Sequence, residues 1–385
     1  MIDFLQKGFE RGGLVQVGKK RKGGGERIEW IDAIKGVGIV LVVFCHYVIL
    51  SEETIIGNFF MTLAWAAVPC FMMASGAMMH QSRVFDWRRH FLKVWKVYGT
   101  LCAWRLIYLV VYVKLQNVQF GRIQLVQYLF LLTDLDGVDT GVMWYMEAYL
   151  TMLLIFPISR FLFCEKIQGE YKGRRVLLYV MFLSMMGSAV LPSVGWGINL
   201  IGDFLQIGRI DINRFVMLIP FVYYGNLLFY FFAGAFVFEY RDWVKRKLGK
   251  YKAALFPLMC MGTGGLMLVK YVDSGLISWG GVYLSEGYSH VLTELISIAF
   301  FLLFMAYEDE WYFLNHFLAR HIGRYTMGIY YLHYILLAAC SIYFYPMIHK
   351  YYSFMANGIK TVLVTLVCVV VTMLLKKIPW VRNLV

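Results

Sequence analysis

Three residues at the start of the first long apolar stretch have side chains that can ionise. Asp32 and Lys35 lie three positions apart, and His46 follows eleven positions after Lys35. A helix turns about 100° per residue, so this spacing returns Lys35 and His46 to within about 20° of one face. Asp32 shares that face and can pair with Lys35 as its i,i+3 neighbour. Because ionisable residues inside a membrane usually face a cavity, we expect a polar stripe here.

The rise of about 1.5 Å per residue separates Lys35 from His46 by roughly 16 Å along the helix axis. We therefore expect Lys35 near the cytoplasmic interface and His46 in the outer half of the membrane. Imidazole is the side chain best suited to proton transfer at neutral pH, so His46 is the candidate general base. Plainer interpretations stay open: Asp32 and Lys35 as an interfacial anchor, and His46 as a buried histidine bonded to a neighbour.

A second polar set recurs every four residues along a later apolar stretch. Glu286, His290 and Glu294 would line one side of a helix over 286–306. Two acids and a histidine on one face inside a membrane indicate a polar lumen. They could bind the hydroxyl groups of a ligand or orient His46, or Glu286 could be interfacial and solvated. No set of residues has clear metal-ligand spacing, so we expect no metal site.

The composition is that of a membrane protein. Of the 385 residues, 60% are apolar and only 16% are charged, and the mean hydropathy is +0.62. Soluble domains are nearer half apolar and a quarter charged. The net charge of +13 could suggest nucleic-acid binding, but basic residues also collect in cytoplasmic loops, and no nucleic-acid motif is present. The seven Cys residues contain no C-x-x-C and predict neither a disulfide framework nor a zinc site.

Long apolar stretches position these polar residues. Each stretch is close in length to the roughly 20 residues that a helix needs to cross a bilayer. A further apolar stretch at 123–133 is too short to cross. We therefore predict an all-α integral membrane protein with about ten transmembrane helices in a single bundle. The predicted spans are 30–50, 59–79, 95–113, 141–163, 175–194, 214–238, 253–270, 286–306, 322–345 and 358–375.

The distribution of basic residues predicts the orientation. Most of the 37 Lys and Arg residues fall in segments that are cytoplasmic if the N-terminus is inside, so both termini are predicted to be cytoplasmic. Residues 1–29 form a basic, Gly-rich tail that either lies on anionic lipid or only sets topology. The membrane domain then covers 30–376, and 377–385 form a short C-terminal tail. We find no internal repeat.

Four motifs occur in the order found in one known family. Lys35 and His46 are separated by ten residues, and residues 69–76 read Pro-Cys-Phe-Met-Met-Ala-Ser-Gly. Residues 143–146 read Met-Trp-Tyr-Met, and 322–333 contain Gly-Arg-Tyr-Thr-Met-Gly-Ile-Tyr-Tyr-Leu-His. Together they resemble the membrane-bound acyltransferase 3 family. Arg is more usual than Lys at the first motif position, and Lys resembles the fucose-4-O-acetyltransferase-like subgroup.

The resemblance implies a bacterial plasma-membrane O-acetyltransferase with several membrane passes. Its donor would be cytoplasmic acetyl-CoA, used as a co-substrate with no permanently bound cofactor. Its acceptor would be a hydroxyl of a cell-surface glycan or sugar. The expected partners are thus the lipid bilayer, acyl-CoA and a glycan, without nucleic acid.

The motifs also suggest individual roles. His46 would be the base, with Lys35 and Asp32 on the donor side or structural, and His333 would assist or be a structural histidine. Ser75 could carry the acyl group, although Ser75 and Gly76 more simply permit close helix packing. Arg105 could neutralise CoA phosphate or pair with an internal acid. The other expected binding residues are Arg83, Arg88, Arg89, Trp144, Glu147 and Tyr330.

Two other functions fit the same residues. A transporter or flippase for a polar or lipid-linked substrate would also need polar side chains within the membrane. The residues that would serve that purpose are Arg105, Glu147, Glu286, His290 and Glu294, although the lack of an inverted repeat counts against it. A non-catalytic sensor or scaffold could use the same fold.

Overall fold

The protein is an all-α integral membrane protein whose described residues form helices and no β-strand. The N-terminal tail up to residue 26 and the predicted site residues Arg83 and Glu286 lie outside the described residues. The computed structural model describes residues 27–46, 54–81, 85–116, 118–166, 170–208, 210, 225–276, 288, 290–348, 354–382 and 384.

Six helical segments of the described chain are long and apolar enough to cross a membrane. The first is α3–α4, the third begins with the short helix η1, and the fourth is interrupted by the π-helical turn η2. Their helices are α3 (Ile55–Ala64) and α4 (Ala67–Met79), α5 (Trp87–Gln116), η1 (Gly141–Met143) and α7 (Trp144–Cys164), α8 (Lys172–Met185), η2 (Met186–Val190) and α9 (Leu191–Leu205), α12 (Arg241–Leu248), η3 (Gly249–Ala254) and α13 (Leu255–Leu276), and α17 (Phe354–Leu375).

Four more apolar helices coincide with the remaining predicted spans. They are α2 (Glu29–Cys45), α11 (Gly225–Glu239), α14 (Val291–Ala306) and α16 (Thr326–Ile348). Every predicted span therefore overlaps a helix, while the count of ten crossings and the location of the termini stay predictions. Three short elements complete the described chain: α6 (Arg122–Leu129), α15 (Tyr312–His321) and η5 (Gly323–Tyr325).

Two helix starts differ from the sequence prediction. The predicted third span began at residue 95, but α5 begins at Trp87 because Asp86 caps it, accepting a hydrogen bond from the Arg89 amide at 3.2 Å. The predicted eighth span included His290, but α14 begins at Val291. His290 is its N-cap residue, with extended backbone at φ −117° and ψ 137°. A search for apolar stretches missed both helix starts, because the capping residues Asp86 and His290 are polar.

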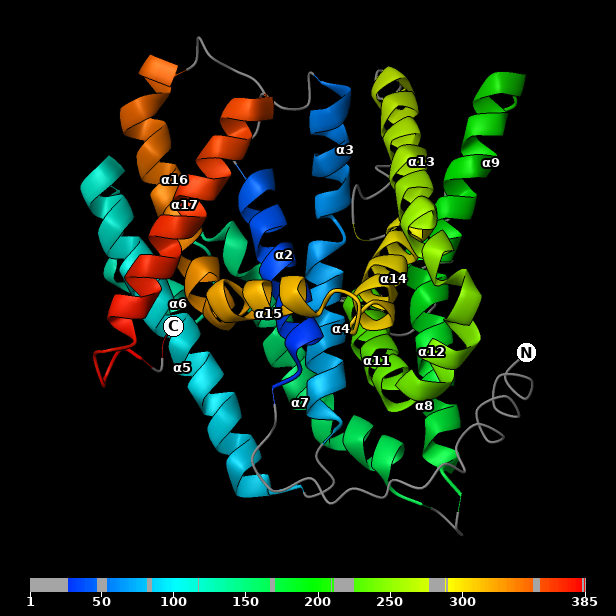
Figure 1. Cartoon of the computed structure of the whole chain (residues 1–385). Helices are drawn as coiled ribbons and strands as arrows, with labels where there is room; N and C mark the ends of the chain where they lie inside the picture. The colour runs from blue at the N-terminus through cyan, green and yellow to red at the C-terminus, as the bar shows by residue number, and fades with distance from the viewer. Residues whose placement is uncertain are drawn as a thin grey trace. The chain divides into compact units, whose positions relative to one another are not determined.

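The described chain divides into two compact units, where the sequence predicted a single bundle. Unit 1 comprises residues 1–38, 62–83 and 157–320, and unit 2 comprises 39–61, 84–156 and 321–385. The helix α2 begins in unit 1 and ends in unit 2. Figure 1 shows the helices of both units coloured along the chain.

Small residues allow close packing in each unit. In unit 1, α4 packs on α11. A Cβ at Gly76 would lie 1.7 Å from the Phe231 carbonyl oxygen, and one at Gly234 would lie 1.9 Å from that of Met73. In unit 2, α16 packs on α17 and on α5. Close approach at small residues is a common way for membrane helices to associate, and here it fixes which faces of α4 and α11 meet.

Candidate active site

Two histidines from distant parts of the sequence lie together in unit 2. His46 occupies the turn that follows α2, and His333 lies two turns into α16. Their ring centroids are 5.2 Å apart and the rings meet edge to face. His333 is fully buried, whereas His46 is partly buried. The sequence predicted both residues as site residues, and the fold brings them together.

Hydrogen bonds define which ring nitrogen of each histidine carries the proton. His46 Nδ1 lies 2.6 Å from the Val42 carbonyl oxygen, and His333 Nδ1 lies 3.0 Å from that of Ile329. A carbonyl oxygen can only accept, so each Nδ1 must donate. In the neutral ring this leaves the lone pair on Nε2. The Nε2 of His333 has no hydrogen-bond partner among the described residues. Both imidazoles thus have the tautomer that a general base needs.

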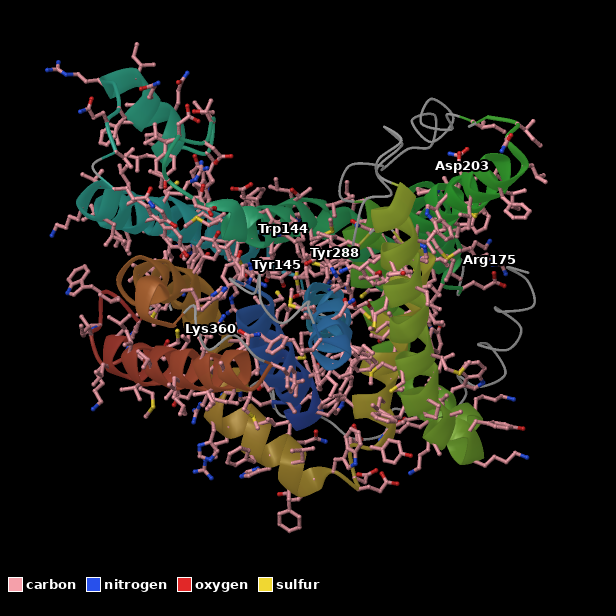
Figure 2. All side chains as sticks on the ribbon, turned by 90° about the horizontal axis from the view of Figure 1, so that it is seen from above. Trp144, Tyr145, Arg175, Asp203, Tyr288 and Lys360 are labelled. Atoms are coloured by element: carbon pink, nitrogen blue, oxygen red, sulfur yellow. The ribbon has the colours of Figure 1, made fainter. Side chains whose placement is uncertain are left out.

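Three side chains that the sequence prediction missed hold this pair in place. The Tyr334 ring lies 5.4 Å from the His46 ring, and its hydroxyl donates to Asp139. The Lys360 ammonium donates to the His46 carbonyl oxygen at 3.3 Å. Lys360 is labelled on α17 in Figure 2. A lysine inside a predicted span was the signal available in the sequence, because such a charge usually has a specific partner.

The end of α2 is fixed by a second polar residue of α17. Asn357 is buried, and its amide donates to the Phe44 carbonyl oxygen at 3.3 Å. With Lys360, it satisfies carbonyl groups that the last turn of a helix leaves without intrahelical donors. The position of His46 therefore depends on α17 as well as on α2.

Tyr330 lies one turn before His333 and connects α16 to the segment before α7. Its ring lies 6.4 Å from the His333 ring and 5.8 Å from that of Tyr145. Its hydroxyl donates to the Val142 carbonyl oxygen. Figure 2 labels Trp144 and Tyr145 at the start of α7. The predicted residue Tyr330 is thus close to the histidine pair.

Arg105 is buried in α5, where its two terminal guanidinium nitrogens are bonded while its Nε has no hydrogen-bond partner among the described residues. Its guanidinium donates to the carbonyl oxygens of Tyr128 at 2.9 Å and Thr133 at 3.4 Å, and to the carboxylate of Asp134. The Tyr128 ring lies 4.7 Å from the guanidinium carbon. Pairing with an internal acid was one of the two predicted roles, but the acid found, Asp134, is 81% exposed. Glu147 lies within electrostatic range of both members of this pair.

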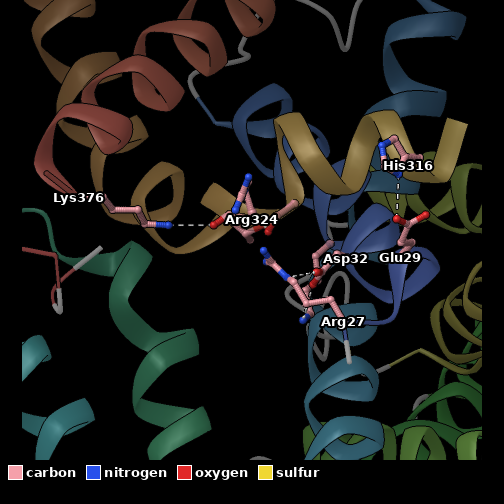
Figure 3. Close-up of polar contacts among 9 residues, drawn as sticks. Arg27, Glu29, Asp32, His316, Arg324 and Lys376 are labelled. Atoms are coloured by element: carbon pink, nitrogen blue, oxygen red, sulfur yellow. Dashed lines mark hydrogen bonds and ion pairs between the residues drawn. The ribbon is translucent and has the colours of Figure 1, made fainter. Parts of the chain in front are cut away.

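Asp32 and Lys35 form the predicted ion pair in unit 1. Lys35 Nζ lies 3.4 Å from Asp32, whose other oxygen accepts from Arg27 at 2.9 Å. One turn earlier, Glu29 bonds His316 of α15 at 2.8 Å. Figure 3 shows the Arg27 and His316 contacts. These bonds fit an anchor for the start of α2.

The remaining predicted residues are not part of the histidine pair. Ser75 is partly buried in α4, where its neighbour Gly76 makes the close contact with α11, as the packing interpretation requires. Arg88 and Arg89 are exposed in the first turn of α5. Arg89 pairs with Asp86 at 3.2 Å.

His290 and Glu294 lie at the start of α14 in unit 1, and both are buried. His290 Nδ1 accepts a hydrogen bond from the Leu292 amide at 3.1 Å. No group of three or more His, Cys, Asp or Glu residues within the described ranges could hold a metal ion.

The comparisons with known proteins agree with the motifs. The sequence pattern described as the Acyltransferase domain matches residues 28–376, nearly the whole chain. No curated protein and no solved structure matches this chain. The match includes both histidines of the pair and every other predicted site residue. The match over residues 28–376 shows that the chain belongs to the acyltransferase 3 family and is therefore a membrane acyltransferase.

Proposed function

We propose that the protein transfers an acetyl or other short acyl group from acyl-CoA to a hydroxyl of a cell-surface glycan or sugar. The observation that carries the proposal is the histidine pair, in which Nδ1 of each ring donates to its own helix and Nε2 keeps a lone pair. A hydroxyl acceptor needs a base of this kind. The bacterial plasma membrane is the compartment that this chemistry suits.

The reaction divides between the residues as follows. His46 Nε2 takes the proton of the acceptor hydroxyl while the hydroxyl oxygen attacks the thioester carbonyl. The tetrahedral intermediate then collapses and expels the CoA sulfur, which receives the proton from the imidazolium. His46 is the base rather than His333 because it is only partly buried, so a hydroxyl can reach it.

The exposed first turn of α5 is our proposed contact for the phosphates of the donor. Arg88 and Arg89 are adjacent cations at a helix N-terminus, where the helix dipole also favours an anion. Replacing both with alanine should raise the KM for acetyl-CoA and leave kcat nearly unchanged.

The test is transfer of radiolabelled acetyl groups from acetyl-CoA to glycan by the purified protein in lipid nanodiscs. We expect His46→Ala to reduce kcat by roughly 10²- to 10⁴-fold, the usual contribution of a general base. His316→Ala is the matched control, because this partly exposed histidine of unit 1 bonds the Glu29 carboxylate and stacks on Tyr312. Full activity in a folded His46→Ala protein would contradict the assignment. Substrate uptake into proteoliposomes without any acyl donor would instead support a transporter.

A further inference from the structure

Four buried polar side chains of unit 1 have atoms without a partner. Tyr230 and Thr293 are 0% exposed, Glu294 is 3% and His290 is 4% exposed. The Tyr230 hydroxyl, Thr293 Oγ1, Glu294 Oε1 and His290 Nε2 make no hydrogen bond within the described part of the chain. None of these groups belongs to the histidine pair of unit 2.

The four groups are close together. His290, Thr293 and Glu294 are related by i,i+3 and i,i+4 spacing at the start of α14, so they share one side of it. Tyr230, on α11, lies within electrostatic range of Glu294 on α14. The helix α4 packs against both α11 and α14, and the Cys70 thiol of α4 donates to the Ser297 carbonyl oxygen at 3.6 Å.

An unmade hydrogen bond is unfavourable for a buried group. Each such donor or acceptor costs about 1–3 kcal/mol, and most buried polar groups in native proteins are therefore bonded. Four in one place form an exception that a bound ligand would remove.

The polarity of the four groups limits the ligand. The Leu292 amide donates to Nδ1 of His290, so the proton of that ring is on Nε2, which can only donate. Glu294 Oε1 accepts, while the hydroxyls of Tyr230 and Thr293 do both. A neutral molecule with several adjacent hydroxyls supplies both donors and acceptors.

Aromatic rings accompany the polar groups. The Trp196 ring of α9 lies 6.4 Å from that of His290, and the rings of Trp65 and Tyr288 meet at 4.9 Å. Tyr288, two residues before His290, is labelled in Figure 2. Aromatic faces accept the apolar C–H faces of sugar rings, while the polar groups bond the hydroxyls.

We propose that Tyr230, His290, Thr293 and Glu294 form a binding site in unit 1 for a neutral sugar residue. This inference rests on the proposed function, because it identifies the sugar of the acceptor as the ligand. It concerns binding alone and assigns these residues no part in the chemistry.

The test measures binding without an acyl donor. Methyl glycosides of glucose, galactose and fucose are titrated by calorimetry into the full chain in nanodiscs. We expect at least one to bind. Glu294→Gln should weaken that binding at least tenfold, because it replaces one carboxyl oxygen with an amide nitrogen that can only donate. Tyr230→Phe should weaken it roughly three- to tenfold, since it loses the hydrogen bond of the hydroxyl to the sugar.

Thermal unfolding separates binding from a structural role. The Tyr230 hydroxyl makes no hydrogen bond to the residues that the structure describes, so Tyr230→Phe should leave the Tm unchanged or raise it. Tyr240→Phe is the matched control, because the Tyr240 hydroxyl accepts a hydrogen bond from Arg174 at 2.6 Å. This control should lower the Tm and leave glycoside binding unchanged.

The inference and the proposed function fail in different ways. If the wild-type protein transfers acetyl groups but binds no glycoside, this site is wrong and the acyltransferase assignment stands. If it binds a glycoside and the variants weaken binding, but no acyl donor supports transfer, the site stands and the proposed function is wrong. Binding unaffected by Glu294→Gln and Tyr230→Phe would also overturn the site.

Discussion

The two imidazoles of unit 2 make the same local hydrogen bond but differ in access. Each donates from Nδ1 to the carbonyl four residues earlier in its own chain segment, which fixes the ring and the tautomer together. His333 is fully buried, so it can orient or polarise His46 more readily than it can meet a substrate. His333→Gln should therefore reduce kcat less than His46→Ala does, in the same acetyl-transfer assay.

Lys360 offers a test of how the base is positioned. Lys360→Met removes the donor to the His46 carbonyl but keeps most of the side-chain volume. We expect a loss of about 1 kcal/mol in the free energy of unfolding, the usual net value of a hydrogen bond, together with a lower kcat. Lys376→Met is the control, because Lys376 makes the same type of bond to the Arg324 carbonyl at 2.9 Å (Figure 3). An equal fall in kcat in both variants would contradict a positioning role.

Arg105 and Asp134 should respond unequally to substitution, although they form one ion pair. The Arg105 side chain is 3% exposed and that of Asp134 is 81% exposed. Arg105→Ala leaves two carbonyl groups without their charged donor and should cost roughly 2–4 kcal/mol, since a hydrogen bond to a charged group contributes about 1.5–3 kcal/mol. Asp134→Asn keeps both carbonyl bonds and an acceptor oxygen for the guanidinium, so it should cost less, about 1 kcal/mol. Chemical denaturation of the two variants measures the difference, and equal losses would contradict this interpretation.

At the scale of the helix, packing depends on two glycines. Gly76→Ala and Gly234→Ala would each place a Cβ within 2 Å of a backbone carbonyl oxygen, which cannot move away as a side chain can. We expect both to lower the Tm strongly. Gly264→Ala is the matched control within unit 1, because a Cβ there meets nothing within 4 Å. It should be neutral or stabilising by up to about 1 kcal/mol, since alanine favours the helix. A normal Tm for Gly76→Ala would contradict this packing.

Apolar length predicted the helices well because it is the property that a membrane selects. It could not predict where α5 or α14 begins, since Asp86 and His290 act there as polar caps. It also gave no indication of α15, whose residues combine charged and apolar side chains. Helix periodicity located the candidate base His46, and a motif supplied His333 and its neighbour Tyr330. Lys360, Asn357 and Asp139 were missed because their roles arise from contacts between segments far apart in sequence.

At the scale of the whole molecule, several bonds join segments that the charge distribution places on the cytoplasmic side. In unit 1, Lys245 pairs with Glu308 at 2.6 Å, and Lys252 with Glu310. In unit 2, Lys376 at the end of α17 bonds Arg324 in η5. Each bond connects two stretches that the predicted topology assigns to the same side, so helix packing and the positive-inside rule give compatible orientations.

This topology predicts the labelling of single introduced cysteines in whole cells. Lys250→Cys lies in an exposed segment predicted to be cytoplasmic, and Asp136→Cys in an exposed segment predicted to be outside. A membrane-impermeant maleimide should label Asp136→Cys in intact cells and Lys250→Cys only after permeabilisation. The unsubstituted protein, with its seven free Cys residues, gives the background. Labelling of Lys250→Cys in intact cells would reverse the orientation. It would then put His46 in the cytoplasmic half of the membrane, on the same side as the acyl donor.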